Sequence, residues 1–333
     1  MSDNGKPKFA MYWAASCGGC EIAVLNINEK ILDVDANFEV VFWPVAMDAK
    51  YKDVEAMPDK SILLTLFNGG IRNEENEHLA ILLRQKSQIL VAFGSCATEG
   101  CIPGLANFSN TDQIYEAVYE GVSTDNPNHI RPQYNYEVPE GTLHIPAFYP
   151  ALRTLDQVVD VDYYMPGCPP ESHQIAAVID LVLKVLNGEA ELPPKGAVIG
   201  AGNSTVCDEC GRKRHVKSIT KFVRIHEVDE IDPELCLLEQ GILCNGPATR
   251  SGCGARCPGV GAACIGCYGP AEGVIDYGAR LMTAVASVID SNDPDEIDAI
   301  LEGIPDPAGS FYRFSMPHSL LRMAKPAWSN GNR

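Results

Sequence analysis

The chain lacks any long hydrophobic run. A membrane-spanning helix needs about 18 consecutive apolar residues, and the most apolar stretch, Ile175–Leu186, is interrupted by Asp180 and Lys184. The first residues, MSDNGKPKFAMYW, contain neither the hydrophobic core of a signal peptide nor a twin-arginine pair. We therefore expect no membrane span and a cytoplasmic location.

The sequence also contains no Gly-x-Gly-x-x-Gly element and no phosphate-binding loop, so we expect no nucleotide site. Basic residues are scarce, because 26 Lys and Arg stand against 44 Asp and Glu, a formal net charge of −18. A negative field over the whole chain argues against nucleic acid and anionic membranes as partners. The acidity itself fits a general role in solubility or a salt-adapted host.

The 333 residues are enough for two domains. Before Gly188, short apolar runs alternate with helical patterns, which predicts a parallel sheet with helices on both faces. We assign this half, 1–190, to a flavodoxin-like, doubly wound α/β domain. The clearest helical patterns are Glu75–Gln85 and Ser172–Leu186. The expected strands are Phe9–Trp13, Phe38–Val45, Ile62–Phe67, Ile89–Phe93 and Tyr163–Met165.

A linker with Pro and Gly, 188–196, crosses into the second half, 191–333, and beyond it the composition changes. The segment Cys207–Cys267 is rich in Cys, Gly and Pro, so its hydrophobic core should be thin and bound metal clusters should hold it together. Glu272–Asp290 should form one amphipathic helix, and the last forty residues should lie along the surface. We therefore expect a smaller, irregular, cysteine-rich iron–sulfur domain. In the first half, the polar segment 107–160 should be an excursion at the rim of the sheet.

Three loops that follow predicted strands carry cysteine. Cys17 and Cys20 form Cys-Gly-Gly-Cys after the first strand, Cys96 lies in Gly-Ser-Cys-Ala, and Cys168 lies in Pro-Gly-Cys-Pro-Pro. The carboxyl ends of parallel strands meet at one edge of a sheet, where such folds bind ligands. Four thiolates at that edge suit a cubane iron–sulfur cluster. The alternatives are a thioredoxin-like dithiol and structural zinc, although zinc ligands usually come as two close pairs.

Eight further cysteines lie in the second half. They can complete two four-cysteine sites, and cytosolic thiols that cluster usually hold metal, since disulfides are rare there. Two zinc ribbons are the rival interpretation, but a ribbon usually has two Cys-x-x-Cys knuckles and neither group has two. Cys101, the one cysteine that belongs to neither the strand-end set nor these eight, should be buried and should not be a ligand. The grouping with least crossing is Cys207, Cys210, Cys236 and Cys244 for one site, and Cys253, Cys257, Cys264 and Cys267 for the other.

In combination, these motifs resemble the small subunits of nickel–iron hydrogenases. The three strand-end motifs are similar to that family's proximal-cluster motifs. Its distal and medial cluster segments are similar to two later stretches, Cys-Leu-Leu-Glu-Gln-Gly-Ile-Leu-Cys-Asn-Gly-Pro and Cys-Ile-Gly-Cys. The resemblance covers Lys8–Pro270 and implies electron transfer through three [4Fe-4S] clusters. The implied ligands are Cys17, Cys20, Cys96 and Cys168 (proximal), Cys207, Cys210, Cys236 and Cys244 (distal), and Cys253, Cys257, Cys264 and Cys267 (medial).

Two departures separate the chain from the membrane-associated members of that family. Those members have a distal histidine where this chain has Cys207, and a proline where it has Cys257, which leaves their medial cluster with three irons. The presence of Cys257 therefore implies four. The stretch Asn68–Arg72, Asn-Gly-Gly-Ile-Arg, most resembles the methyl-viologen-reducing branch, which in methanogens passes electrons to heterodisulfide reductase. A deazaflavin- or NAD(P)-reducing hydrogenase is the alternative within the family.

The resemblance also implies partners. A hydrogenase large subunit would carry the nickel–iron centre, because this chain has no second pair of Cys-x-x-Cys motifs of the kind that ligates nickel and iron. An iron–sulfur acceptor subunit, linked to heterodisulfide reductase, would receive the electrons. Two other classes compete with this interpretation. A complex I-like quinone-proximal subunit would have adjacent cysteines in its first motif and no eight-cysteine domain, and a structural zinc protein would have no redox role.

Two charged features have both a functional and an ordinary interpretation. Glu21, next to Cys20, could relay protons at the large-subunit interface, or it could be a solvated glutamate at a helix start. The run Arg212–Arg214, beside the distal set, could orient an electron acceptor on an otherwise acidic body. It could equally be a solvated turn.

Overall fold

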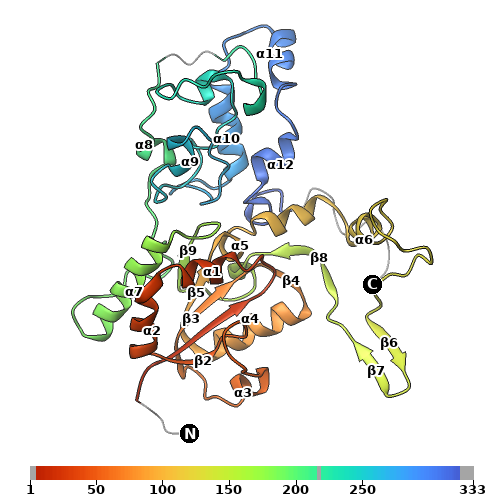
Figure 1. Cartoon of the computed structure of the whole chain (residues 1–333), viewed down its shortest axis with the longest axis vertical. Helices are drawn as coiled ribbons and strands as arrows, with labels where there is room; N and C mark the ends of the chain where they lie inside the picture. The colour runs from red at the N-terminus through yellow and green to blue at the C-terminus, as the bar shows by residue number, and fades with distance from the viewer. Residues whose placement is uncertain (1–4, 216–218, 323–333) are drawn as a thin grey trace.

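Five parallel strands form the sheet of the lower lobe in Figure 1, in the order β2-β1-β3-β5-β9. The computed structural model describes residues 5–215 and 219–322. All five predicted strands are confirmed, with ends that differ by at most three residues, and the flavodoxin-like order is confirmed with them. The strands are β1 (Lys8–Trp13), β2 (Glu39–Phe42), β3 (Ile62–Asn68), β5 (Ser87–Phe93) and β9 (Tyr163–Met165).

Helices cover both faces of this sheet. Because successive side chains of a strand point to opposite faces, Phe9 and Met11 of β1 join one buried cluster and Ala10 and Tyr12 join another. The first cluster includes residues of α1, α2 and α7, and the second includes residues of α4. The helices are α1 (Gly19–Leu25), α2 (Ile31–Asn37), α3 (Tyr51–Glu55), α4 (Glu74–Lys86) and α7 (Ser172–Leu186).

The segment 107–160 is an excursion from the sheet, as predicted. It projects to one side of the lower lobe in Figure 1 and contains β8, which pairs antiparallel with β4. No helix in the described part of the chain is long and apolar enough to cross a membrane. The elements around and within this excursion are β4 (Ile71–Asn73), α5 (Ser95–Thr98), α6 (Thr111–Tyr119), β6 (Asn135–Val138), β7 (Gly141–His144) and β8 (Phe148–Arg153).

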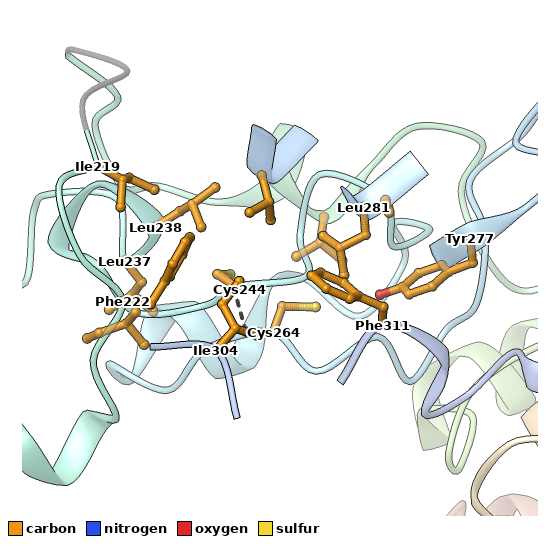
Figure 2. Close-up of a cluster of buried hydrophobic side chains, with 14 of the residues drawn as sticks. Ile219, Phe222, Leu237, Leu238, Cys244, Cys264, Tyr277, Leu281, Ile304 and Phe311 are labelled. Atoms are coloured by element: carbon orange, nitrogen blue, oxygen red, sulfur yellow. Dashed lines mark hydrogen bonds between the residues drawn. The ribbon is translucent and has the colours of Figure 1, made fainter. Parts of the chain in front are cut away.

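The upper lobe has a larger hydrophobic core than the sequence indicated. Figure 2 shows this core, in which Phe222, Leu237 and Leu281 pack around two of the cysteines, Cys244 and Cys264. The prediction of a thin core was wrong because later helices complete it. They are short, and the lobe contains α8 (Val206–Glu209), α9 (Arg256–Gly259), α10 (Tyr277–Ala286), α11 (Pro294–Leu301) and α12 (Pro307–Tyr312).

Two expectations about the end of the chain are corrected. The predicted helix Glu272–Asp290 is the shorter α10, because Asp276 caps its first turn by accepting from the Ala279 backbone N–H at 2.8 Å. The last forty residues were expected to lie along the surface, but within 294–322 Phe311 and Tyr312 are 6% exposed and Met316 is fully buried, while 323–333 lie outside the described residues. Apolar side chains on three short helical segments produce no long periodicity, so sequence patterning missed them.

The chain returns to the lower lobe after α12. The Cys101 backbone N–H donates to the Phe314 carbonyl at 3.1 Å, and the Gln157 side chain donates to the Pro317 carbonyl at 2.8 Å. The His318 ring then lies 3.2 Å from a carboxylate oxygen of Glu99. These contacts join the two lobes beside the first cysteine set. The boundary between residues 190 and 191 stays a prediction.

The His318 contact should make stability depend on pH. The hydrogen bond and charge of Glu99 raise the pKa of His318 to about 9, above the ~6.5 of an unfolded histidine. Its contribution is therefore complete below about pH 6.5 and disappears as the pH rises through about 9. The ring is 39% exposed, so we expect His318→Gln to cost about 1 kcal/mol or less at pH 6 and nothing at pH 10. Anaerobic thermal unfolding of both proteins at the two pH values measures this, and an equal deficit at both would contradict it.

Candidate metal centres

The first four predicted cysteines gather at the carboxyl edge of the sheet. Cys17 and Cys20 flank the start of α1, Cys96 lies in α5 directly after β5, and Cys168 follows β9. Strand order reverses between β1 and β3, so this is the crevice where such sheets bind ligands. Burial and then the nearby Cys96, Cys168 and Cys17 thiols raise the pKa of Cys20 well above its usual range. The structure therefore brings this whole set together.

Glycine lets the backbone approach the first set closely. Gly94, at the end of β5, has a φ of 81°, and a Cβ there would lie 2.4 Å from the Cys20 sulfur. A side chain at this position would displace the thiol and strain the backbone. The Gly19 backbone N–H donates to the Cys17 sulfur at 3.4 Å. Both features suit a bound cluster, because the backbone can approach it closely and its N–H groups can hydrogen-bond the sulfurs.

Cys101 is fully buried, as predicted, but it also contacts the first set. A hydrogen bond from its thiol lowers the pKa of Cys168 to about 7 and holds the pKa of Cys96 below its usual value. The Cys101 backbone has a positive φ of 48° and is held by its bond to Phe314. The structure thus places a hydrogen-bond donor between two predicted ligands, which the sequence spacing did not indicate.

Glu21 is at a helix start but is not solvated. Its side chain is in the first turn of α1 and the residue is 2% exposed. The Asn68 side-chain amide donates to both carboxylate oxygens, at 3.2 and 3.0 Å. Burial raises the pKa of Glu21 despite these hydrogen bonds. Asn68 begins the Asn-Gly-Gly-Ile-Arg stretch, so that stretch contacts the edge of the first set.

The second set lines a cavity of about 350 Å³ in the upper lobe. Burial and then the nearby thiols of Cys244, Cys236 and Cys210 raise the pKa of Cys207 to about 12, with the Arg214 charge opposing them. A Cβ on Gly246 would lie 3.1 Å from the Cys207 sulfur and 3.7 Å from that of Cys244. All four predicted members, Cys207, Cys210, Cys236 and Cys244, line this cavity.

The third set lies on the loops around α9. Burial and then the thiols of Cys253, Cys168 and Cys257 raise the pKa of Cys267 to about 12. Burial, then the Cys244 thiol of the second set and then the Cys267 thiol raise the pKa of Cys264 well above its usual range. Cys257, in α9, is exposed. Cys267 therefore neighbours Cys253, Cys257 and Cys264, and so connects the four predicted members.

The three sets follow one another through the molecule. Cys168 of the first set lies close enough to Cys267 of the third to perturb its pKa, and the Ser95 hydroxyl donates to the Cys267 carbonyl at 2.5 Å. At the other end, the Cys264 backbone N–H donates to the Cys244 sulfur at 3.4 Å, the dashed line in Figure 2. The third set thus lies between the first and the second.

The residues present fit iron–sulfur clusters. All thirteen cysteines are free thiols, and buried thiols with raised pKa values would be neutral at pH 7 unless bound metal deprotonated them. Backbone N–H groups already point at two of the sulfurs. Among the described residues, no three or more His, Cys, Asp or Glu side chains are arranged so that they could hold a single metal ion. A cubane has its ligands at four corners, so it requires a wider arrangement than one ion does.

The basic run beside the second set is largely occupied. Arg212 donates to three backbone carbonyls, and Lys213 pairs with Glu234 at 2.6 Å. Arg214 is exposed and lies near Cys207. Arg212 is therefore committed to contacts within the chain, while the docking role of the run stays a prediction, with Arg214 as its exposed member near a predicted ligand.

Comparison with known proteins agrees with this arrangement. The family model described as NADH ubiquinone oxidoreductase, 20 Kd subunit, matches residues 17–182, which contain most of the sheet. The iron–sulfur subunit of the F420-non-reducing hydrogenase of Archaeoglobus profundus is 42% identical over 94% of this chain and 97% of its own length. The corresponding F420-non-reducing hydrogenase subunits of Methanocaldococcus jannaschii and Methanothermobacter marburgensis are 38% and 34% identical, each over 96% of this chain and 98% and 97% of their own lengths.

These similarities first define a class, the small subunit of a hydrogenase, which is one component of an oxidoreductase complex. Because several relatives match nearly end to end, the chain belongs to the family of F420-non-reducing hydrogenase iron–sulfur subunits. The near-complete coverage includes the eight-cysteine lobe, which the 20 Kd subunit model does not reach.

Proposed function

We propose that this chain carries electrons from the nickel–iron centre of a hydrogenase large subunit, through three [4Fe-4S] clusters, to an iron–sulfur acceptor subunit. The observation that supports it is the continuous series of cysteine sets, in which Cys168 neighbours Cys267 and Cys264 neighbours Cys244. When bound, each cluster would take up and release one electron at a time. Twelve of the thirteen cysteines are then the ligands, in the three groups predicted from sequence.

Electrons would enter at the sheet edge and leave at the second set. Cys17 is exposed there, which suits close approach of the large subunit. In this first site Gly94 leaves room for the Cys20 sulfur, and the Gly19 N–H donates to the Cys17 sulfur. At the far end, Arg214 supplies a positive charge near Cys207 in a chain of net charge −18. Such a charge can orient an acidic acceptor subunit.

The branch of the family guides the choice of acceptor. Several relatives that match nearly end to end are described as F420-non-reducing, so we place the chain in a complex that delivers electrons toward heterodisulfide reductase rather than to deazaflavin. We also propose a cytoplasmic location for that complex. In domain terms, 1–190 would hold the proximal cluster and 191–333 the medial and distal ones.

Reduction by dihydrogen tests this function. The purified complex of this chain with its large subunit should show all three clusters reduced after a single mixing with dihydrogen, because the three sets form one path. Freeze-quenched electron paramagnetic resonance follows the reduction, and the isolated chain without the large subunit is the control that should stay oxidised. If dihydrogen never reduces one of the clusters in the complex, the cysteine set that holds this cluster is not part of the electron path.

A further inference from the structure

Two side chains of the Cys207–Lys213 segment bind the backbone of the third set. The Glu209 carboxylate accepts from the Gly252 N–H at 2.8 Å through one oxygen and from the Gly254 N–H at 3.0 Å through the other. These glycines are the two neighbours of Cys253. Glu209 lies between Cys207 and Cys210 of the second set, so a residue of one site fixes the backbone around a ligand of the next.

Arg212 makes the same kind of connection on the other side. Its Nε donates to the Pro258 carbonyl at 2.8 Å, and Pro258 directly follows Cys257. Its Nη1 donates to the Asp232 carbonyl at 2.7 Å and to the Leu235 carbonyl at 2.9 Å. Leu235 directly precedes Cys236 of the second set. One half-buried guanidinium therefore links the backbone next to Cys257 of the third set to the backbone next to Cys236 of the second set.

We propose that Glu209 and Arg212 are positioning residues that fix the third cysteine set relative to the second, and so set the electronic contact between the two clusters. This inference rests on the proposed function. Glu209 holds the backbone around Cys253, and Arg212 holds the backbone after Cys257. Because both residues lie on one short segment, the two contacts together fix the distance and the orientation of the third set relative to the second. The planar guanidinium is preorganised for several hydrogen bonds at once, which lysine cannot reproduce. Outer partners of this kind hold ligands in place in metal sites generally.

The test compares single variants of the complete hydrogenase complex. Glu209→Ala removes the carboxylate acceptor and Arg212→Met removes the guanidinium donors. In contrast, Glu209→Gln keeps a hydrogen-bond acceptor, and Arg212→Lys keeps a charged donor. Lys213→Met is the matched control, because the Lys213 side chain pairs with the exposed Glu234. The readouts are the spin–spin interaction between the reduced second and third clusters, by electron paramagnetic resonance, and the rate at which a chelator removes iron from each.

We expect Glu209→Ala and Arg212→Met to change the interaction spectrum and to release iron from the third site about 10-fold faster or more. Glu209→Gln and Arg212→Lys should recover part of both properties, and Lys213→Met should match the wild type. Wild-type spectra and release rates in both Glu209→Ala and Arg212→Met would overturn the inference. If Arg212→Met fails to assemble, an unchanged spectrum in Arg212→Lys together with Glu209→Ala would overturn it instead. Failure of the proposed function is distinguishable, because the wild-type complex would then show no interacting clusters.

Discussion

Replacing Cys96 by serine should nearly abolish hydrogen-dependent reduction of an electron acceptor by the complex. Cys96 is buried at the carboxyl end of β5 and helps to raise the pKa of Cys20, so it lies inside the first set. Its loss should remove the cluster that receives electrons first, while the second and third sets keep their iron. Because a ligand itself is lost, the rate should fall more than the 10- to 100-fold that is typical of outer partners, about 100-fold or more. Methyl viologen reduction under dihydrogen measures this rate.

Cys101→Ser is the matched control for that experiment. Serine keeps a hydrogen-bond donor beside Cys168 and Cys96, so iron content and rate should stay close to those of the wild type. Cys101→Ala should also keep its iron, but the potential of the first cluster should fall, because hydrogen bonds to cluster sulfurs raise it. Equal loss of iron in Cys96→Ser and Cys101→Ser would show that Cys101 is a ligand, contrary to our assignment.

Replacing Cys257 by proline should convert the third cluster from four irons to three. Cys257 is exposed in the first turn of α9, where proline can be accommodated because it removes no helical hydrogen bond. The remaining ligands Cys253, Cys264 and Cys267 would hold a three-iron cluster. The total should fall by about one iron per chain, and the oxidised variant should show a three-iron electron paramagnetic resonance signal.

Two further variants separate the ligand from its backbone. Cys257→Ala should give the same three-iron signal without the constraint of proline, and Val260→Ala, at a site 84% exposed on the turn after α9, should leave four irons. A three-iron signal in wild-type protein prepared without oxygen would contradict the assignment of Cys257. So would a four-iron third cluster in Cys257→Ala.

Much of the fold and the grouping of the cysteines could be predicted from the sequence because their signals are local. Each strand of the sheet is a short apolar run, and α7, Ser172–Leu186, has its predicted limits. The first set was predictable because each of its loops follows such a run. The other two sets follow chain order, and the structure brings together the members of each group.

The features that escaped prediction depend on contacts between distant segments. In the sequence Arg212 is one of three similar basic residues, yet its carbonyl partner at Pro258 is 46 residues away. The buried carboxylate of Glu21 accepts a hydrogen bond from the side-chain amide of Asn68, which is 47 residues further along the chain. The return of His318 to Glu99 likewise has no local signature. Hydrophobic periodicity reports which face of a helix or strand is buried, but it does not identify the segment that covers it.

Metal content and spectroscopy of the anaerobically matured chain test the central claim most directly. Three sets of four cysteines should bind about twelve irons per chain, with no stoichiometric zinc. Reduction should produce the electron paramagnetic resonance signals of three four-iron clusters. A reproducible count near eight irons, or one zinc per four-cysteine site, would contradict the account.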